Sequence, residues 1–254
     1  MTLLPWQWAL AALGAFGVGL SKTGIAGLGI LVVALFALVM PPRASVGVVL
    51  PILISADFVA VGAFRRHADW AHLRRLFPWA AAGVVLGYFA LGRLGDTQIE
   101  KMIGAIVLAM AVVQYVRRGR ARRAAPDGAE EPSIPHHLAF VAGMGLLAGF
   151  TTMVANAAGP VLILFLLAMG LPKMAFIGTS AWFFLALNLF KVPFSAQLGL
   201  INPAALGVSA ALAPFAVAGA LCGRAILRHI PQRLFEDLAL FLTVIAGLRL
   251  LWPF

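Results

Sequence analysis

The sequence is poor in charged residues and almost free of cysteine. Lys, Arg, Asp and Glu make up 11% of its 254 residues, whereas 62% are hydrophobic. A soluble domain carries about 25% charged residues, so this composition excludes an ordinary soluble protein. The one cysteine, Cys222, excludes an intrachain disulfide. No basic residue precedes Lys22, so no cleavable signal peptide is predicted and the first apolar segment is expected to be retained.

Recognisable catalytic and metal-binding patterns are also missing. The sequence contains no HExxH motif, no GxSxG motif and no paired carboxylates in an apolar setting. An intramembrane enzyme is disfavoured because no nucleophile–base set and no metal set is present. The sequence therefore predicts a protein that is not an enzyme and that uses no metal and no cofactor.

The net charge of +10 does not indicate a nucleic-acid-binding protein. The basic residues gather in short loops between apolar segments, as in the cytoplasmic loops of membrane proteins. No soluble fold that could present them to a nucleic acid is evident. We therefore expect the lipid bilayer, rather than a nucleic acid, to be a partner.

The apolar segments predict an all-α integral membrane protein, because a chain inside lipid must satisfy its own backbone hydrogen bonds. The first two segments of each half are short, so each pair either spans the membrane fully or forms a broken, re-entrant pair. The segments cover residues 6–20, 24–40, 44–64, 78–94, 98–116, 136–150, 153–170, 174–194, 203–223 and 234–252.

The two halves of the chain resemble each other. Gly19 and Gly149 are 130 positions apart, and the same offset pairs Lys22 with Thr152 and Gly29 with Gly159. Gly92-Arg93 matches Gly223-Arg224 at an offset of 131. The sequence thus predicts a first membrane repeat at 1–116, a cytoplasmic linker at 117–135 and a second membrane repeat at 136–254.

Basic loops set the expected orientation. The loop containing Arg65, Arg66, Arg74 and Arg75 is placed in the cytoplasm, as is the arginine-rich linker. The corresponding loop of the second half, 195–202, carries no charge and is placed outside. Equivalent loops then lie on opposite sides, so the repeats are inverted, each with three full-spanning helices plus a short helix pair, eight to ten hydrophobic segments in all. Both termini are predicted outside.

Two polar interruptions mark the candidate site. Residues 19–30 place a lysine, two hydroxyls and several glycines inside an apolar run, and residues 149–160 repeat the pattern without a lysine. A lysine beside hydroxyls and a helix N-terminus is typical of an anion site. Alternatively, Lys22 lies in a loop, and the second-half residues only satisfy broken backbone. The predicted substrate-binding residues are Ser21, Lys22, Thr23, Gly24, Gly27, Gly29, Thr151, Thr152 and Asn156.

Other polar residues lie within apolar segments. Asp57 is an acid well inside the third segment, so it is a candidate coupling residue or a partner for Lys22. Asn188 and Lys191 share one helical face. We expect Lys191 to snorkel toward the outer surface, and Arg249 to anchor the last helix in the same way.

The sequence resembles the TauE/SafE family of sulfite-exporter-like membrane transporters. The resemblance lies in Gly24-Ile-Ala-Gly-Leu-Gly29, in Ala-Ala-Gly-Pro160, in the stretch from Gly170 to Ser180, and in Gly92-Arg93 with Gly223-Arg224. It implies export of a small sulfur-containing anion, such as sulfite, sulfoacetate or another organosulfonate, across a bacterial inner membrane. Both interruptions carry fewer glycines than the family pattern, and Lys22 adds an unexpected charge.

These observations predict an inner-membrane, multi-pass transporter that moves a small anionic substrate by alternating access. A channel-like anion pathway and a non-transporting membrane scaffold or assembly protein are the alternatives. A homodimer is left open, as are the anion, the direction of transport and the coupling ion.

Overall fold

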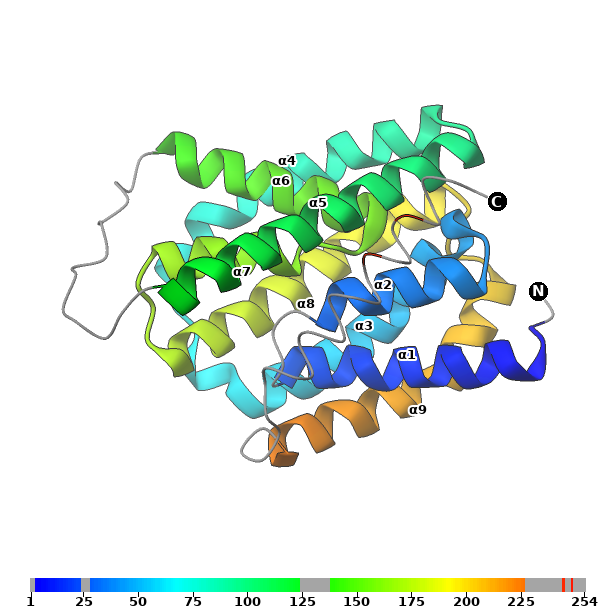
Figure 1. The fold of residues 1–254 in the computed structure, drawn as a ribbon, viewed down its shortest axis with the longest axis horizontal. Helices are drawn as coiled ribbons and strands as arrows, with labels where there is room; N and C mark the ends of the chain where they lie inside the picture. Colours follow the sequence, from blue (N-terminus) through cyan, green and yellow to red (C-terminus); the bar gives the residue numbers. More distant parts are fainter. Residues whose placement is uncertain (1–2, 24–27, 124–137, 227–243, 245–247, 249–254) are drawn as a thin grey trace.

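The structure is a computed structural model that describes residues 3–23, 28–123, 138–226, 244 and 248. Within these ranges the chain forms α-helices joined by short loops, with one 3₁₀ turn (Figure 1). The elements are α1 (Pro5–Thr23), α2 (Leu28–Val39), α3 (Pro42–Phe64), η1 (Arg65–His67), α4 (Trp70–Arg93), α5 (Asp96–Arg123), α6 (Leu138–Ala155), α7 (Gly159–Ala168), α8 (Lys173–Gln197) and α9 (Pro203–Ile226).

Five of these helices, α3, α4, α6, α8 and α9, have the length and apolar composition needed to cross a membrane. By contrast, α2 has 12 residues and α7 has 10. At 1.5 Å per residue they are about 18 and 15 Å long, well short of the roughly 30 Å hydrocarbon core of a bilayer. The chain is therefore a multi-pass membrane protein whose described residues form helices and loops, and two of the described helices are too short to span.

The first helix of the chain packs directly on its last described helix. At Gly19 of α1, an added Cβ would lie 2.0 Å from the carbonyl oxygen of Ala216 in α9. At Gly219 of α9, a Cβ would lie 2.0 Å from the carbonyl oxygen of Phe16 in α1. Backbones this close require glycine, as in small-xxx-small membrane helix contacts. The α1/α9 pair thus forms by backbone-to-backbone packing.

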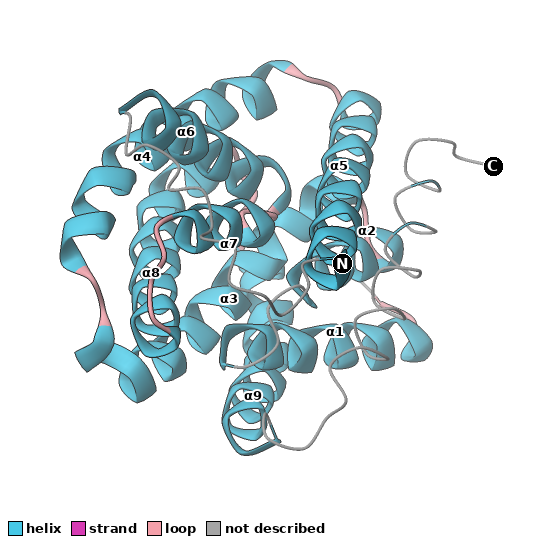
Figure 2. Ribbon diagram, turned by 60° about the vertical axis from the view of Figure 1, so that its left-hand side comes forward, coloured by secondary structure: helices cyan, strands magenta, loops and turns pink. Residues whose placement is uncertain are grey.

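A second pair, α4 and α6, is built in the same way. A Cβ on Gly149 of α6 would lie 1.9 Å from the carbonyl oxygen of Ala80 in α4, and one on Gly83 would lie 2.2 Å from that of Leu146. In Figure 1, α4 and α6 run from left to right, whereas α1 and α9 run from right to left. Figure 2 places the two pairs at opposite ends of the assembly, with α3, α7 and α8 between them.

Two helix boundaries differ from the sequence-based expectation. The expected segment at 78–94 begins eight residues earlier, at Trp70, because Asp69 caps α4 and Pro78 is accommodated inside the helix. The second interruption was expected from Gly149, but α6 continues to Ala155. Gly149 does not break the helix because it serves the close contact with α4. The break falls at 156–158 instead.

The expected linker, 117–135, also begins differently. Its first seven residues, 117–123, continue helix α5, and arginine is a good helix former. Residues 124–137 and most of the expected last segment, 234–252, including Arg249, lie outside the described residues.

Candidate functional site

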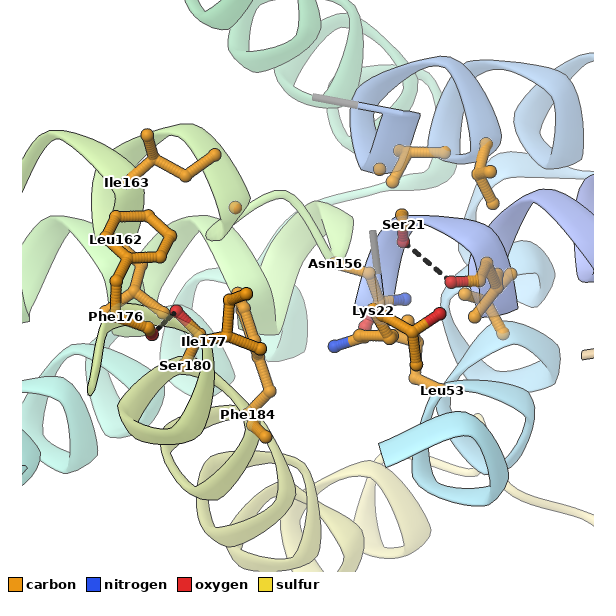
Figure 3. Close-up of a pocket in the computed structure, with 18 residues that line it drawn as sticks. Ser21, Lys22, Leu53, Asn156, Leu162, Ile163, Phe176, Ile177, Ser180 and Phe184 are labelled. Atoms are coloured by element: carbon orange, nitrogen blue, oxygen red, sulfur yellow. Dashed lines mark hydrogen bonds between the residues drawn. The ribbon is translucent and has the colours of Figure 1, made fainter. Parts of the chain in front are cut away.

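A cavity of about 130 Å³ lies where α1 ends and where α2 and α7 begin. Figure 3 shows Ser21, Lys22 and Asn156 on one side of it, facing an opposite wall made by α7 and α8. That wall is mainly apolar and includes Leu162, Ile163, Phe176, Ile177 and Phe184, with the hydroxyl of Ser180 among them. The cavity is therefore amphipathic, with its polar groups gathered at the end of α1.

The cation at this cavity is held by an acid of the neighbouring helix. Nζ of Lys22 lies 2.8 Å from Oδ1 of Asp57, and it also lies 3.7 Å from the ring centroid of Phe184. Only 8% of the Lys22 side chain and none of the Asp57 side chain is exposed. The pairing of Asp57 with Lys22, one of the two expectations for that acid, is confirmed. The ion pair and the aromatic face together stabilise a charge removed from water.

The other oxygen of Asp57 connects this ion pair to helix α8. Oδ2 of Asp57 accepts a hydrogen bond of 2.6 Å from the amide nitrogen of Asn188. The amide oxygen of Asn188 in turn accepts one of 3.4 Å from Nζ of Lys191, one turn further along α8. The amide thus links a carboxylate on one side to a second lysine on the other.

Lys191 is completely buried and takes its remaining partners from the end of α6. Its Nζ donates to the hydroxyl oxygen of Thr152 at 3.1 Å and to the amide oxygen of Asn156 at 2.6 Å. Asn156 also donates from its amide nitrogen to the carbonyl of Val46 in α3, at 3.2 Å. Its φ of 53° lies in the left-handed region, where asparagine is tolerated better than most residues. Asn156 therefore ends α6, contacts Lys191 and lines the cavity.

Two short helices begin at the cavity. Gly29 lies in the first turn of α2 and Gly159 is the first residue of α7, and both line the cavity. A Cβ added at either position would meet nothing within 4 Å. The first backbone N–H groups of a helix lack partners within that helix, so these open glycines leave room for a ligand near two helix N-termini.

The structure brings most of the described candidate residues to this cavity. Ser21, Lys22, Thr23, Gly29 and Asn156 line it. The hydroxyl of Ser21 donates to Val18 of its own helix, and that of Thr23 donates to Ala220 of α9 at 2.8 Å. Both hydroxyls therefore have partners already. Gly24 and Gly27 lie outside the described residues.

Thr151 and Thr152 are not among the residues that line the cavity. Both are buried within α6 rather than at a loop tip. The hydroxyl of Thr151 donates to the carbonyl of Leu147 in its own helix. The hydroxyl oxygen of Thr152 instead accepts a hydrogen bond from the ammonium group of Lys191.

The expectation that Lys191 snorkels to the outer surface was wrong, because none of the residue is exposed. Its position six residues before the end of α8 suggested an easy route to water. Lys191 instead turns inward to the end of α6, which reaches it from a distant part of the sequence. The useful signal was the helical face that it shares with Asn188, since two polar residues on one face of an apolar helix indicate a polar neighbour.

Comparison with known proteins gives short matches to two named relatives. The chain is 33% identical over 67 residues to the "Probable membrane transporter protein MamO" of Magnetospirillum gryphiswaldense and to that of Paramagnetospirillum magneticum. Each match covers 24% of this chain, and 11% and 10% of the two relatives, respectively. The chain thus spans about a tenth of the length of these curated relatives.

No solved structure matches the chain. The family comparison is far more extensive, since the family described as "Sulfite exporter TauE/SafE" matches residues 10–250. That range takes in every residue that lines the cavity and every residue of the polar network behind it. The chain therefore belongs to the TauE/SafE sulfite exporter family.

Proposed function

We propose that this chain is a membrane transporter that binds a small sulfur-containing anion in the cavity beside Lys22. The single observation that carries the proposal is a nearly buried lysine at the wall of a cavity where two short helices begin. The family description and the relatives' names, a sulfite exporter and probable membrane transporters, support the class of cargo and the activity.

The electrostatics of the cavity favour an anion. Lys22 has one oxygen of Asp57 as its ionic partner and an aromatic ring at its side, so its remaining donor capacity is available. Charges interact far more strongly in a low-dielectric interior than in water. An anion bound here would accept from Lys22 and from the first N–H groups of α2 and α7, near Gly29 and Gly159.

The apolar wall suits the rest of such a ligand. Leu162 and Phe176 lie across the cavity from Lys22 (Figure 3), and the ring of Phe184 lies against its ammonium group. An organosulfonate has one compact anionic group and a carbon chain, which matches a cavity that is cationic on one side and apolar on the other. Sulfite would use the cationic side alone.

The two halves are arranged, in this proposal, as inverted repeats. Phe16 contacts Gly219, and Leu146 contacts Gly83. Leu146 lies 130 positions after Phe16, and Gly83 lies 136 positions before Gly219. The contact of Leu20 with Gly223 is repeated by Phe150 with Gly87 at the same two offsets. These repeated contacts support the duplication, and they favour pairing Gly87, rather than Gly92, with Gly223.

The opposite directions of the α1/α9 and α4/α6 pairs support the inversion (Figure 1). Each half then contributes one long helix followed by a short re-entrant helix, α1 with α2 and α6 with α7. Such broken helices at the interface between inverted repeats are typical of transporter binding sites. Alternating access would follow from the two tight pairs rocking as units around the cavity.

The proposed membrane orientation places η1 and the start of α4 in the cytoplasm of a bacterial cell. Arg65, Arg66, Arg74 and Arg75 gather there and are exposed, which agrees with the charge bias of cytoplasmic loops. The first repeat, 1–116, and the second, 136–254, would then be joined on the cytoplasmic side by residues 117–135. We place the protein in the inner membrane, with both termini outside the cytoplasm.

The test is anion binding to the purified, full-length protein in detergent or nanodiscs. The panel is sulfite, methanesulfonate, sulfoacetate, sulfate and acetate, with Lys22→Met as the variant. Lys101→Met is the matched control, because Lys101 is an exposed lysine of α5 outside the cavity. We expect at least one sulfur-containing anion to bind, with affinity reduced at least about 100-fold in Lys22→Met, since a desolvated charge contact contributes about 2–5 kcal/mol. Unchanged binding in that variant would exclude Lys22 as the site.

Flux into liposomes separates the transporter from its alternatives. A transporter that works by alternating access saturates with anion concentration and catalyses exchange of labelled for unlabelled anion. A channel-like pathway shows no such accelerated exchange, and a scaffold shows no flux at all. If the wild-type protein neither bound nor transported any anion of the panel, the proposed function would be overturned.

A further inference from the structure

When protonated, Lys191 carries a charge for which the described part of the polar network holds no separate counter-ion. Its Nζ contacts three oxygens, one each from Thr152, Asn156 and Asn188, and all three belong to uncharged groups. Among the described residues, the one carboxylate in the network is Asp57, and it is paired with Lys22. A buried charge without a partner costs several kcal/mol, so an ionisable residue in a membrane helix is a candidate for a functional role.

The charged groups nearest to Lys191 in the network are Asp57 and Lys22, an ion pair at the anion cavity, so the protonation of Lys191 depends on the charge at that cavity. Asp57 of α3 reaches it through the amide of Asn188, and Lys22 of α1 lies beyond Asp57. From α4, Tyr88 packs on Phe194, one turn beyond Lys191. Helix α7 has no titratable residue. The cations of η1 lie near Trp182, about two and a half turns away along α8.

The network charges can be counted in four states. With Lys191 protonated and no anion bound, Lys22, Asp57 and Lys191 sum to +1. An anion of charge −1 beside Lys22 brings that sum to zero. The sum is also zero when the anion is absent and Lys191 is neutral. With an anion bound and Lys191 neutral, the sum is −1.

Only the two neutral states can change conformation cheaply inside a membrane. A net charge enclosed in low dielectric costs several kcal/mol, whichever its sign. The neutral states are the one with both anion and proton and the one with neither. A cycle that exchanged the anion for a proton would instead pass through the two charged states, +1 and −1.

From this relationship we propose that Lys191 is the coupling residue and that the anion and one proton cross the membrane together, in the same direction. The inference rests on the proposed function, because it needs an anion beside Lys22. Asp57 then keeps its charge throughout and serves to hold Lys22 and Asn188 in place.

The proton step involves only the amine of Lys191. Its nitrogen lone pair takes a proton from water as the anion enters, and the ammonium returns that proton to water as the anion leaves. Asn156 connects the anion to Lys191, since it lines the anion cavity and its amide oxygen lies 2.6 Å from Nζ of Lys191. The charges of Lys22 and of protonated Lys191 repel each other, and a bound anion offsets that repulsion.

The test uses labelled methanesulfonate, which stays a monoanion between pH 5 and 8, with the full-length protein in liposomes. For the wild type, a pH gradient of one unit with the outside acidic is expected to drive about tenfold accumulation of the anion inside. An imposed potassium diffusion potential is expected to have no effect. Entry of the anion should make the liposome interior more acidic, by one proton per anion.

Two substitutions at Lys191 should break the cycle in different ways. Lys191→Gln removes the proton site, so flux should lose its response to the pH gradient and follow the membrane potential instead. Lys191→Arg keeps a permanent charge, so the loaded protein can still change conformation but the empty one cannot. The Lys191→Arg variant should retain exchange of labelled for unlabelled anion, and its net accumulation of anion should fall at least tenfold. Lys101→Gln, at an exposed lysine of α5, is the control.

The outcomes distinguish this inference from the proposed function. Wild-type flux that follows the membrane potential, or anion entry driven by an outside-alkaline gradient, would overturn proton co-transport. Persistent pH-driven accumulation in Lys191→Gln would overturn the role of Lys191. A wild type that neither binds nor moves any anion of the panel would overturn the proposed function itself, and the coupling scheme with it. The wild-type measurements decide the direction of coupling even where a variant fails to fold.

Discussion

Lys22 and Asp57 form an ion pair of 2.8 Å between the last turn of α1 and the interior of α3, and neither side chain is more than 8% exposed. Asp57 thus occupies the position beside Lys22 that an anion would also seek. An internal carboxylate and a bound anion compete for the same ammonium group.

Asp57→Asn is therefore expected to raise anion affinity at least about tenfold, because the competing charge is removed while the amide keeps the shape. The anion-free variant should be less stable by roughly 3–5 kcal/mol, since Lys22 is left buried without its partner. Titration calorimetry and the anion-induced shift in Tm measure both effects. Asp69→Asn, at an acid that does not line the cavity, should leave the affinity unchanged. Equal or weaker anion binding in Asp57→Asn would contradict the competition.

Thr152 and Thr151 provide a matched pair of neighbours with different partners. Thr152→Val removes an acceptor of the buried Lys191 ammonium group, so we expect a loss of about 1–3 kcal/mol in the free energy of unfolding. Thr151→Val removes a hydroxyl that bonds only to carbonyls of its own helix, and should change stability by less than about 0.5 kcal/mol. Thermal unfolding in detergent compares the two. Thr152→Ser, which keeps the oxygen, should behave like the wild type, and equal losses in both valine variants would rule out the Lys191 contact.

Gly149 and Gly143 lie on the same helix but have opposite surroundings. A Cβ on Gly149 would lie 1.9 Å from a backbone oxygen of α4, whereas one on exposed Gly143 would meet nothing within 4 Å. We expect Gly149→Ala to lower stability by about 2 kcal/mol or more through overpacking. Gly143→Ala should be neutral or stabilising by up to about 1 kcal/mol, because alanine is the better helix former. Equal Tm values for the two variants would show that α4 and α6 do not pack this closely.

Asp69 caps the first turn of α4, outside the membrane-spanning segments. Its Oδ1 accepts from the backbone N–H groups of His72 and Ala71, and the bond from His72 is the main reason that its pKa lies below its ordinary value. A lowered folded-state pKa stabilises the protein above the unfolded pKa of about 3.9, and that contribution is lost as the pH falls through the lower folded value.

Asp69→Ala should cost about 1 kcal/mol at neutral pH, whereas Asp69→Asn should keep most of the cap. Below pH 4 the wild type loses stability partly because Asp69 becomes protonated. The asparagine variant should not show that part of the loss. Thermal unfolding between pH 3 and 7 provides the measurement. An alanine variant as stable as the wild type at pH 7 would mean that the cap does not support α4.

Sequence patterns sufficed where a residue's role depends on its own segment. The apolar segments identified the helices that the structure describes, and the polar stretch at 149–160 contained the break at 156–158. The acid inside an apolar helix indicated that Asp57 has a charged partner. Helix starts were less predictable at α4, because an aspartate cap followed by a basic turn and an internal proline resembles a loop.

The parts that escaped prediction depend on contacts between distant segments. Whether a glycine ends a helix or permits close packing depends on its neighbour, and for Gly149 that neighbour is Ala80. Whether a lysine near a helix end turns to water or inward depends on what lies beside it. For Lys191 this is the end of α6, which contributes Thr152 and is followed by Asn156. Neither neighbour is specified by the local sequence.

The close packing of α1 on α9 and of α6 on α4 also has a consequence for biosynthesis. As the chain leaves the ribosome, α1 enters the membrane about 180 residues before α9, the partner that Gly19 requires. During this interval the glycine face of α1 contacts lipid or the insertion machinery instead of a neighbouring backbone. The Lys22 ammonium group likewise has no ion pair with Asp57 until α3 has entered the membrane. Assembly of the first half therefore cannot be completed until the second half has been inserted.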